Sequence, residues 1–376
     1  MNIYRYLAKK IENDLGKGKI IILCGARQVG KTTLVRGFLR PNIDVYYNCD
    51  QEDVRESFEK ANLEHLSSLV KKYDRVIVDE AQRVKNIGLT LKILIDNFPE
   101  KNFIVTGSSS LELANTISEP LTGRYFSHLL FPISFLELSS QLNPLRLMET
   151  LEERMIFGSY PEVVTTQDRR DKQRIVEGVA ADYLFKDILN FGIVRNPDML
   201  KKLLRAIALQ LGNEVSVSEL SRTLEVDNET VKRYLDLCEK LFILVSLAPY
   251  HSNKRKSIAK MKKYYFFDLG IRNALIQNFN PLSVRNDVGA LWENLMVLER
   301  TKRNSAQDIF PQYFFWRSYQ GQEIDLIEDT SGTMRAFEFK YKKDAVPKKV
   351  REIFLQELGG KEFSIVRKEN FMEFVL

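Results

Sequence analysis

The first third of the chain alternates short apolar runs with longer amphipathic segments. The apolar runs have the length and the β-branched content of buried strands, and they are KIIILC, DVYYNC, RVIVDE and NFIVTG. The segments between them place apolar residues at helical spacing, and they are KTTLVRGFLR, DVRESFEKANLEHLSSLVKKY and NIGLTLKILIDNF. Strands that alternate with helices in this way predict βαβ units and a parallel sheet covered on both faces.

The pattern of apolar and polar positions changes twice further along the chain. Between about Pro132 and Arg205 nearly every segment has helical spacing, which predicts a set of helices after the sheet. Beyond Arg205, helices and short strands alternate again. We find no fixed-period repeat and no low-complexity tract. A chain of 376 residues is long enough for roughly two to four domains at about 150 residues each.

The segment that begins at Glu214 has the pattern of a helix, a turn and a second helix. Ser216 and Glu219 are spaced as a capping box at the start of the first helix. After the turn, either Asp227 or Asn228 caps the second helix. Together these features predict a helix-turn-helix, the motif whose second helix enters a groove of DNA in many regulators.

Two strand patterns, FILVSLAPY and KKYYFFD, follow this motif and bracket a basic stretch, so a wing is expected beside the helices. On the second helix, Lys232 and Arg233 lie toward the solvent face. The basic residues from Asn253 to Lys263 are Lys254, Arg255, Lys256, Lys260, Lys262 and Lys263. We expect Lys232, Arg233, Lys254, Arg255 and Lys256 to contact DNA phosphates without reading its sequence. The alternative is a winged helix that docks protein or acts as a spacer.

Overall composition excludes several classes of protein. The 56 basic and 50 acidic residues leave a net charge of +6, which is too modest to name a partner. The three cysteines and three histidines lie far apart, so neither a disulfide framework nor a zinc site is expected. No apolar run approaches the ~20 residues of a membrane helix, and the N-terminus lacks the apolar core of a signal peptide. A cytoplasmic protein without membrane contact is therefore expected.

The segment GARQVGKT, Gly25 to Thr32, matches the phosphate-binding pattern G-x-x-x-x-G-K-[ST] between a strand and a helix. Its glycines let consecutive backbone N–H groups point at phosphate oxygens, next to the positive end of a helix. Lys31 is expected to reach the β- and γ-phosphates, and the Thr32 hydroxyl to ligate Mg²⁺. The candidate nucleotide-binding residues are Gly25, Ala26, Arg27, Gln28, Val29, Gly30, Lys31, Thr32 and Thr33.

Acidic and hydroxyl residues at the ends of two later strands complete this candidate site. Asp79 closes RVIVDE and is expected to hold the Mg²⁺ with its hydration shell. Glu80 is the candidate general base that polarises the attacking water. Ser108, at the end of NFIVTGSSS, is a candidate sensor of the γ-phosphate, although Ser109 and Ser110 also suit the cap of the next helix.

Six segments resemble a family of prokaryotic AAA+-type ATP-binding proteins with a C-terminal domain of uncharacterised function. They are KIIILCGARQVGKTTL, RVIVDEAQ, IVTGSSS, LTGRY, GSYPE and YLFKDI. The resemblance implies an ATPase core with the strand order 5-1-4-3-2, followed by a helical lid. The guanine-selective motif Asn-Lys-x-Asp does not occur, so ATP is expected rather than GTP.

The same resemblance gives Arg124, in LTGR, a candidate role. Related ATPases often place an arginine after the sensor segment, where it touches the γ-phosphate either in cis or from a neighbouring subunit. Self-association through Arg124 is then expected in the second case. The alternative is a surface arginine held in a salt bridge.

The sequence near the C-terminus predicts a hairpin that brings carboxylates together. With Ser331 and Gly332 as the central turn residues, Asp325 lies opposite Glu338, and Glu323 lies opposite Lys340. Alternation along the strands places these four side chains on one face. The other face is predicted to hold Ile324, Leu326, Phe337 and Phe339. Two opposed carboxylates repel each other unless a cation lies between them, and a divalent metal is a natural candidate.

The spacing D-(x)₁₂-E-x-K from Asp325 to Lys340 resembles the core of the restriction-endonuclease-like PD-(D/E)xK nucleases. The resemblance implies metal binding by Asp325 and Glu338, a first acidic residue at Glu293, and a catalytic Lys340. It also implies Mg²⁺ or Mn²⁺ at this site and an α-β-β-β-α-β order of elements. Ile324 stands where the fullest form of that family has proline. The alternative is a solvated face with a Glu323–Lys340 pair.

Together these observations predict an α/β protein with a P-loop AAA+-type parallel sheet, a helical lid, a winged helix and a small α/β nuclease-like domain. The predicted modules are 1–135 for the ATPase core, 136–205 for the lid, 206–268 for the winged helix and 269–376 for the nuclease-like domain. The predicted function is ATP binding and hydrolysis in a protein that acts on DNA, with a metal-dependent nuclease tail. The alternative is a nucleotide-gated switch, in stress response or phage defence, whose tail binds without cleaving.

Overall fold

The computed structural model describes residues 3–107, 121–182, 196–251, 261–342 and 348–376. The chain divides into two compact units. The N-terminal unit consists of residues up to Pro132 together with the short segment 240–242, and the C-terminal unit consists of 133–239 and 243–376. The first division therefore lies close to the predicted boundary at 135/136. The predicted boundaries at 205/206 and 268/269 lie inside the C-terminal unit and stay predictions.

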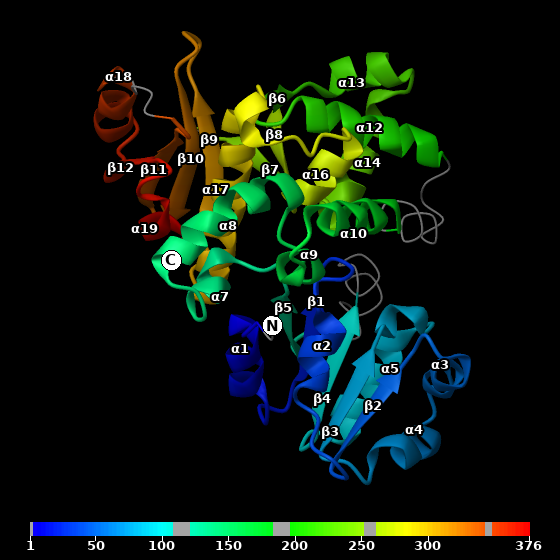
Figure 1. The fold of residues 1–376 in the computed structure, drawn as a ribbon. Helices are drawn as coiled ribbons and strands as arrows, with labels where there is room; N and C mark the ends of the chain where they lie inside the picture. The colour runs from blue at the N-terminus through cyan, green and yellow to red at the C-terminus, as the bar shows by residue number, and fades with distance from the viewer. Residues whose placement is uncertain (1–2, 108–120, 183–195, 252–260, 343–347) are drawn as a thin grey trace. The chain divides into compact units, whose positions relative to one another are not determined.

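The N-terminal unit is built on a five-stranded parallel sheet. Its strands are β1 (Ile20–Cys24), β2 (Asp44–Asn48), β3 (Arg75–Asp79), β4 (Asn102–Gly107) and β5 (Tyr125–Leu129). They lie in the order β5-β1-β4-β3-β2, which confirms the predicted order 5-1-4-3-2. Figure 1 shows these strands in blue to teal with helices on both sides of the sheet. The central strands are buried, apart from the first residues of β3 and β4, because helices cover both faces, and this agrees with their continuous apolar runs.

Three amphipathic segments predict helices in this unit, and two of them form single helices as expected. The helices of the unit are α1 (Tyr6–Asp14), α2 (Lys31–Arg36), α3 (Glu52–Glu59), α4 (Leu63–Val70), the 3₁₀ turn η1 (Ala81–Arg83) and α5 (Ile87–Asn97). The segment predicted as one helix after β2 is broken into α3 and α4. Asn62 causes the break, because its side chain accepts the backbone N–H of Glu64 at 2.9 Å and starts a new helix. Phe58, Leu66 and Leu91 then pack into the hydrophobic core on one face of the sheet.

The C-terminal unit begins with the predicted set of helices. They are α7 (Phe135–Ser139), α8 (Pro144–Phe157), α9 (Pro161–Thr165), α10 (Arg169–Asp182) and α12 (Pro197–Leu209). A buried ion network attaches α7 and α8 to the long helix α17 (Val288–Ala306). Glu299 of α17 accepts the backbone N–H of Phe135 at 2.7 Å and lies 3.4 Å from Arg154 and 2.7 Å from Lys302. The helices predicted as a lid are therefore packed on an element of the predicted nuclease-like tail.

A winged helix follows α12, as the sequence predicts. Its further elements are β6 (Glu214–Val215), α13 (Val217–Leu224), α14 (Asn228–Lys240), β7 (Leu244–Pro249) and β8 (Lys262–Phe266). Strands β6, β8 and β7 form an antiparallel sheet beside the helices. Ser216 accepts the backbone N–H of Glu219 at 3.3 Å. Asp227, rather than Asn228, caps α14 by accepting the N–H of Thr230 at 2.7 Å.

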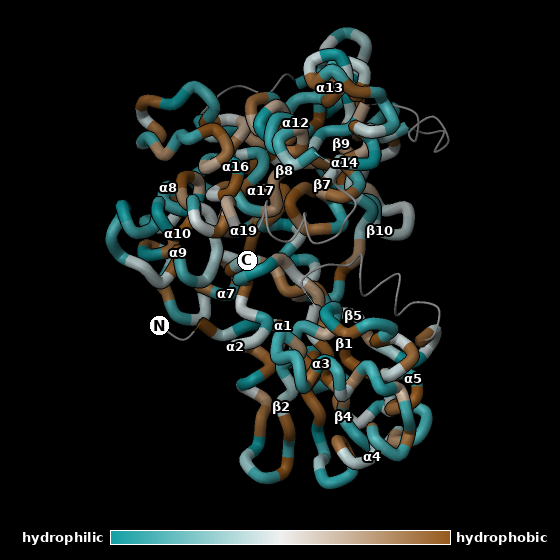
Figure 2. Tube along the Cα trace, turned by 90° about the vertical axis from the view of Figure 1, so that its right-hand side faces the viewer, coloured by the Kyte–Doolittle hydropathy of each residue, from teal (hydrophilic) through white to brown (hydrophobic). Residues whose placement is uncertain are grey.

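The wing hairpin and the tail share one sheet. The tail contributes α16 (Leu269–Leu275), the 3₁₀ turn η3 (Leu282–Val284), α17, β9 (Gln312–Arg317), β10 (Glu323–Thr330), β11 (Thr333–Phe339), α18 (Lys348–Glu352), the π-turn η4 (Ile353–Glu357), β12 (Glu362–Val366) and α19 (Phe371–Val375). The seven strands lie in the order β12-β11-β10-β9-β7-β8-β6, because β7 pairs in parallel with β9. Figure 2 shows hydrophobic residues, in brown, along the interior strands and hydrophilic residues, in teal, on many of the loops.

The fold class predicted from the sequence is confirmed. The chain is an α/β protein with a parallel P-loop sheet, a helical segment, a winged helix and a small α/β tail whose elements run α-β-β-β-α-β from α17 to β12. Among the described residues, no helix combines the length and the apolar character that a membrane crossing needs.

Candidate functional site

The nucleotide loop lies between the end of β1 and the start of α2, and two glycines fix its path. A Cβ atom on Gly25 would lie 2.5 Å from the carbonyl oxygen of Leu130, so only glycine permits this approach of two backbones. Gly30 has φ of +96°, a conformation that residues with a side chain rarely adopt, and α2 begins directly after it. The loop therefore adopts the strand-turn-helix arrangement that binds phosphate at a helix N-terminus.

The side chain of Lys31 lies inside this loop and is 5% exposed. Its ammonium group donates to the carbonyl oxygens of Gly25 at 2.9 Å and Ala26 at 3.0 Å. Loop carbonyls thus hold the cation at the site where phosphate oxygens are expected. Burial raises the pKa of the Cys24 thiol beside it to about 11, so this cysteine stays protonated and inert.

Asp79 is buried at the end of β3 and is surrounded by hydroxyl donors. The Thr32 hydroxyl donates to its Oδ2 atom at 2.8 Å. The hydroxyl groups of Tyr46 and Thr106 also donate to the Asp79 carboxylate. A threonine hydroxyl next to a carboxylate is a donor set that fits Mg²⁺, which prefers oxygen ligands. Thr32 and Asp79 are therefore brought together as the sequence predicts, whereas the contributions of Tyr46 and Thr106 were not foreseen.

Glu80 follows Asp79 in a left-handed backbone conformation, with φ of +54°. Its N–H donates to the Thr106 hydroxyl at 3.1 Å, and its carboxylate accepts the side-chain amide of Gln82. Burial raises the pKa of Glu80, while the nearby Lys31 ammonium opposes that rise. A carboxylate whose pKa is raised in this way is a stronger base, which suits the predicted role. Ser108, the candidate sensor, lies outside the described residues.

The side chain of Arg5, which the sequence did not single out, contacts the nucleotide loop and supports its conformation. The Arg5 guanidinium donates to the carbonyl oxygen of Val29 at 2.9 Å and to that of Phe131. These bonds connect the loop before α2 to the segment after β5. Arg5 precedes the helix α1 and belongs to no motif, so its role depends on a contact that the sequence does not reveal.

Arg124 lies far from the nucleotide loop within its own unit. Its backbone oxygen accepts the N–H of Ile20, at the start of β1, whereas the loop follows the end of that strand at Cys24. Four strand residues at roughly 3.3 Å each separate the two ends by about 13 Å. The side chain forms a salt bridge with Asp96 at 2.7 Å and is 39% exposed. This geometry argues against contact with the nucleotide in cis, and the contact in trans stays a prediction.

The predicted hairpin in the tail has the predicted register. Leu326 pairs with Phe337 and Thr330 with Thr333, so Ser331 and Gly332 are the central turn residues. Continued beyond the last pair, this register places Asp325 opposite Glu338. A register shift in the pairing of β10 with β9, a β-bulge, lies between Ile324 and Ile327.

The bulge changes which side chains share a face. Ile324 packs with Ile327, Met334 and Ala336, so the prediction that it shares a face with Leu326, Phe337 and Phe339 is wrong. On each side of the bulge, strand residues alternate between the two faces as predicted. The bulge itself has no recognisable signal in the sequence.

Asp325 and Glu338 are both buried, with 6% of each residue exposed. Asp325 accepts the backbone N–H of Phe339 at 2.7 Å, and Glu338 accepts the Lys340 ammonium at 2.7 Å through its Oε1 atom. The Oε2 atom of Glu338 is buried and has no hydrogen-bond partner. Burial, together with the charges of Glu293 and Glu338, raises the pKa of Asp325 well above its ordinary value.

Two further residues of this cluster come from the wing strand β8 and were not predicted. Lys263 forms ion pairs with Glu293, at 2.9 Å, and with Glu323. Tyr265 donates its hydroxyl to Glu293 at 2.6 Å. The sequence suggested a Glu323–Lys340 pair, but Glu323 pairs with Lys263 instead. Lys263 was counted among the basic wing residues, whereas its relative exposure is only 1%.

The cluster opens into a cavity of about 740 Å³ inside the C-terminal unit. Glu293, Asp325 and Lys340 are among its lining residues, together with Arg285 and Lys342. Within the described parts of the chain, no three or more acidic, cysteine or histidine side chains group as a metal site. The donors available for a metal here are therefore the two opposed carboxylates rather than a ready set of three.

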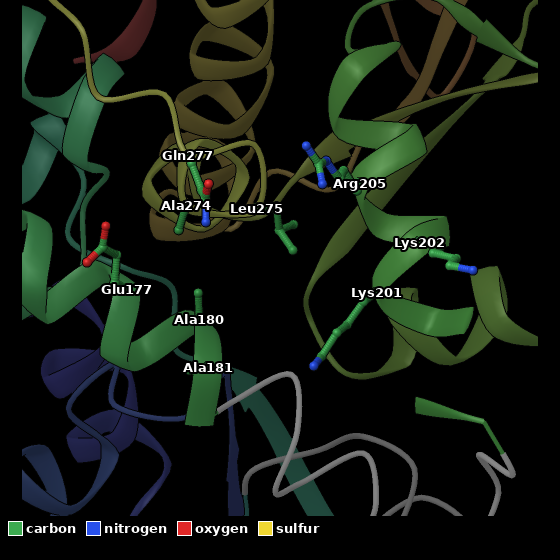
Figure 3. Close-up of a pocket in the computed structure, with 9 residues that line it drawn as sticks. All are labelled: Glu177, Ala180, Ala181, Lys201, Lys202, Arg205, Ala274, Leu275 and Gln277. Atoms are coloured by element: carbon green, nitrogen blue, oxygen red, sulfur yellow. The ribbon is translucent and has the colours of Figure 1, made fainter. Parts of the chain in front are cut away.

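The candidate DNA-contact residues are only partly described. Lys232 and Arg233 are exposed on α14, as expected, whereas Lys254, Arg255 and Lys256 lie outside the described residues. A cleft of about 550 Å³ lies beside α12, between α10 and α16. Figure 3 shows Lys201 and Arg205 extending from α12 toward this cleft. Lys202 also lines it, and Glu177 is the acidic residue among the lining side chains.

Comparison with family models divides the chain into three matched segments. Residues 17–139 match the family described as AAA domain. Residues 148–282 and 288–373 match two families that are described as domains of unknown function, DUF8612 and DUF4143. The AAA match covers the sheet and the nucleotide loop described above.

Relatives that match most of this chain occur in bacteria and archaea. An uncharacterized protein of Mycobacterium tuberculosis is 28% identical over 343 residues, which cover 89% of this chain and 73% of the relative. An uncharacterized protein of Haemophilus influenzae is 26% identical over 331 residues, covering 82% of this chain and 79% of the relative. One of Methanocaldococcus jannaschii is 24% identical over 344 residues, covering 86% and 75%.

Among solved structures, a Walker-type ATPase of Pyrococcus abyssi is similar with a TM-score of 0.49 and 18% identity. The similarity covers 72% of this chain and 94% of that chain. The parallel sheet, the geometry of the nucleotide loop and the family match agree with one another. Residues 17–139 therefore match the AAA domain family and contain a parallel sheet with a P-loop between its first strand and the following helix.

Proposed function

We propose that this protein binds and hydrolyses ATP in its N-terminal unit and acts on DNA through its C-terminal unit. There, the tail cleaves phosphodiester bonds with a divalent metal. The observation that supports cleavage most strongly is the pair Asp325 and Glu338. Asp325 lines a cavity, and the hairpin register extended by one pair places it opposite Glu338, which has a buried oxygen without a partner. A purely structural pair of buried carboxylates is costly without a cation.

In the N-terminal unit, each residue has a separate task. Loop N–H groups and Lys31 bind the phosphates, while Thr32 and Asp79 would hold Mg²⁺. A bound Mg²⁺ would neutralise charge on the phosphate oxygens. Glu80 orients and deprotonates the attacking water, a task for which its raised pKa is suited. Tyr46 and Thr106 hold the Asp79 carboxylate in place.

In the tail, Asp325 and Glu338 would hold a Mg²⁺ or Mn²⁺ ion, because two carboxylates and a substrate phosphate are a common ligand set for such ions. The ion would supply charge stabilisation at the phosphate and a more acidic water. Lys340 lies 2.7 Å from Glu338, where its ammonium can orient the water or stabilise developing negative charge. Arg285 and Lys342 line the same cavity and offer positive charge to a phosphate backbone.

DNA is proposed to bind without sequence selectivity, through phosphate contacts. The exposure of Lys232 and Arg233 on α14 supports this proposal, and Lys254, Arg255 and Lys256 of the wing remain candidates. The cleft beside α12 adds Lys201, Lys202 and Arg205 to the same unit (Figure 3). Affinity is expected to fall steeply with salt, because released counterions drive such binding.

Plasmid cleavage in Mn²⁺, with and without ATP, tests the proposal. Wild type should nick the plasmid, Glu338→Ala should not, and Lys31→Ala should lose ATP turnover by about 100-fold or more. An exposed lysine outside the loop, replaced in Lys9→Ala, is the matched control for Lys31. Cleavage that persists in Glu338→Ala would remove the nuclease assignment. Turnover that survives Lys31→Ala would remove the assignment of the nucleotide loop.

The second candidate is a nucleotide-gated switch whose tail binds DNA or protein without cleaving it. The ion pairs of Lys263 with Glu323 and of Lys340 with Glu338 favour it, because they neutralise part of the cluster without a metal. This candidate predicts slow ATP turnover and an intact plasmid in both Mg²⁺ and Mn²⁺. The same assay therefore separates the two functions.

A further inference from the structure

The carboxylate cluster contains a lysine that comes from outside the tail. Lys263 belongs to β8 of the wing hairpin, and its relative exposure is 1%. Its ammonium lies 2.9 Å from the Oε1 atom of Glu293 on α17 and forms an ion pair with Glu323 on β10. It also lies 5.5 Å from the centre of the Phe315 ring. This ammonium is the shared cation of two carboxylates, so its removal would leave both of them without their partner.

Tyr265 strengthens the same arrangement. It lies two residues after Lys263, so both side chains project from one face of β8. Its hydroxyl donates at 2.6 Å to the oxygen of Glu293 that also contacts Lys263. The Oε1 atom of Glu293 thus already accepts two hydrogen-bond donors. This oxygen is poorly placed to serve a metal as well.

The second carboxylate pair, Asp325 and Glu338, still has an oxygen that accepts no hydrogen bond. Glu338 has one oxygen bound to Lys340 and one buried oxygen with no partner. Asp325, opposite it, contacts the backbone N–H of Phe339 through a single oxygen. Among the described carboxylates of this cluster, Glu338 therefore has the one fully buried oxygen that lacks a hydrogen-bond partner.

The formal charges of the cluster also indicate that it accommodates one divalent cation. The cluster contains four carboxylates, namely Glu293, Glu323, Asp325 and Glu338, and two ammonium groups, namely Lys263 and Lys340. If every group is ionised, the cluster carries an excess of two negative charges. One divalent cation balances that excess, whereas two divalent cations would leave the cluster positive.

We propose that Lys263 acts as a built-in cation that keeps Glu293 and Glu323 from coordinating metal, so that the tail holds a single divalent ion at Asp325 and Glu338. This inference rests on the proposed metal site in the tail. It assigns Glu293 to Lys263 and Tyr265 rather than to the metal, which differs from the role that the nuclease resemblance implies. Lys263 is then a positioning residue, and it sets the number of ions that the site accepts.

Mn²⁺ binding without nucleotide, followed by electron paramagnetic resonance and isothermal titration calorimetry, tests this. All proteins carry Thr32→Ala so that the nucleotide loop contributes no ion. We expect one Mn²⁺ for the parent protein and two for Lys263→Met, because that change frees Glu293 and Glu323. Lys263→Met combined with Glu293→Gln preserves the net charge of the cluster, and one Mn²⁺ should bind with an affinity within about threefold of the parent.

The matched control is Lys340→Met combined with Glu338→Gln, which also preserves the net charge but removes a proposed ligand. Its Mn²⁺ affinity should fall by about tenfold or more. If the Lys263→Met/Glu293→Gln protein loses Mn²⁺ to the same extent, Glu293 is a ligand and the inference is overturned. A parent protein that binds no Mn²⁺ would instead overturn the metal site itself. The two charge-conserving variants decide the question even if Lys263→Met alone does not fold.

Discussion

At the scale of single residues, the nucleotide loop depends on cationic side chains that hold backbone carbonyl oxygens. Lys31 contacts two of these oxygens from inside the loop, and Arg5 contacts Val29 from outside it. Such charge-assisted bonds are stronger than neutral ones. The loop is therefore held in shape by residues that lie 26 positions apart.

Arg5→Ala should weaken ATP binding by about tenfold, because the loop loses a hydrogen bond from a charged donor worth about 1.5 kcal/mol. Titration with a fluorescent ATP analogue measures this. Lys9→Ala, which removes an exposed cation from the neighbouring helix α1, should leave the affinity unchanged. Equal affinities for the two variants would contradict the role given to Arg5.

The described cysteines should react slowly in the native protein. Burial raises the pKa of Cys24 to about 11 and that of Cys49 to about 12. At pH 8 roughly one Cys24 thiol in a thousand is then ionised, and the thiolate is the reactive form. Iodoacetamide labelling followed by mass spectrometry should be at least about 100-fold slower in the native than in the urea-unfolded protein. Rapid native labelling of Cys24 would show that β1 is more open than described.

Asp287 should make stability depend on pH. It lies between the buried guanidinium groups of Arg272 and Arg285. Burial raises the pKa of Asp287, but the hydrogen bonds from these two arginines outweigh burial and lower the pKa to about 2. The folded-state pKa is below the ordinary value of 3.8. The stabilisation is therefore fully present above about pH 4 and is lost as the pH falls toward 2.

Asp287→Asn should lower the free energy of unfolding by about 3 kcal/mol at pH 7, because two buried guanidinium groups lose their partner. Urea unfolding at pH 7 and at pH 3 measures the effect, and the difference from wild type should shrink at the lower pH. Asp171→Asn, at an exposed position, is the control and should change little at either pH. A difference that is constant with pH would contradict the assigned ion pair.

At the scale of elements, patterns that are local in sequence were enough to predict most strands and helices. The hairpin of β10 and β11 was predicted with its register, because Ser331 and Gly332 mark the turn and alternation fixes the pairing. The nucleotide loop was predicted because its glycines, its lysine and its neighbouring elements are contiguous. The break between α3 and α4 was missed, although Asn62 was a local signal for it.

The features that could not be predicted depend on contacts between distant segments. Lys263 belongs to a basic stretch in the sequence, and only the pairing of β7 with β9 brings β8 and its lysine to the tail. Arg124 lies in the LTGR segment, at the position where related ATPases often place a nucleotide-contacting arginine. However, β5 runs parallel to β1, so Arg124 lies at the end of the sheet opposite to the loop. The bulge at Asp325 also depends on its neighbour β9. Sequence periodicity contains no information on these pairings.

The β10–β11 turn gives a prediction at this scale. Gly332 has φ of +85°, and no atom lies within 4 Å of a Cβ built on it, so backbone strain is the whole effect of a side chain there. Gly332→Ala should destabilise the protein by about 1 kcal/mol in urea unfolding. Ser331→Gly is the matched control: Ser331 has φ of +52°, so glycine should relieve strain rather than add it. A neutral Gly332→Ala would mean that the turn relaxes into another type.

At the scale of the whole molecule, Arg124 raises the question of assembly. This arginine lies at the end of β1 opposite to the nucleotide loop, which argues against contact with the nucleotide of its own chain, and contact in another copy of the chain stays the prediction. ATP turnover per chain should then rise with protein concentration, and Arg124→Ala should abolish that rise. Asp96→Asn frees the arginine from its salt bridge, and this variant should still show the rise in turnover with protein concentration. Turnover that is independent of concentration in all three proteins would leave Arg124 as a surface residue.

The parallel pairing of β7 with β9 limits where the gene can be divided by recombination. A gene fusion or deletion with its break between the codons of Pro249 and Gln312 would separate the two strands, leaving each new protein with an uncovered strand edge. Such edges promote aggregation. The winged helix and the tail are therefore expected to pass between genes as one piece. A tail recombined without its own wing hairpin would also lose Lys263, and with it the cation that pairs with Glu293 and Glu323.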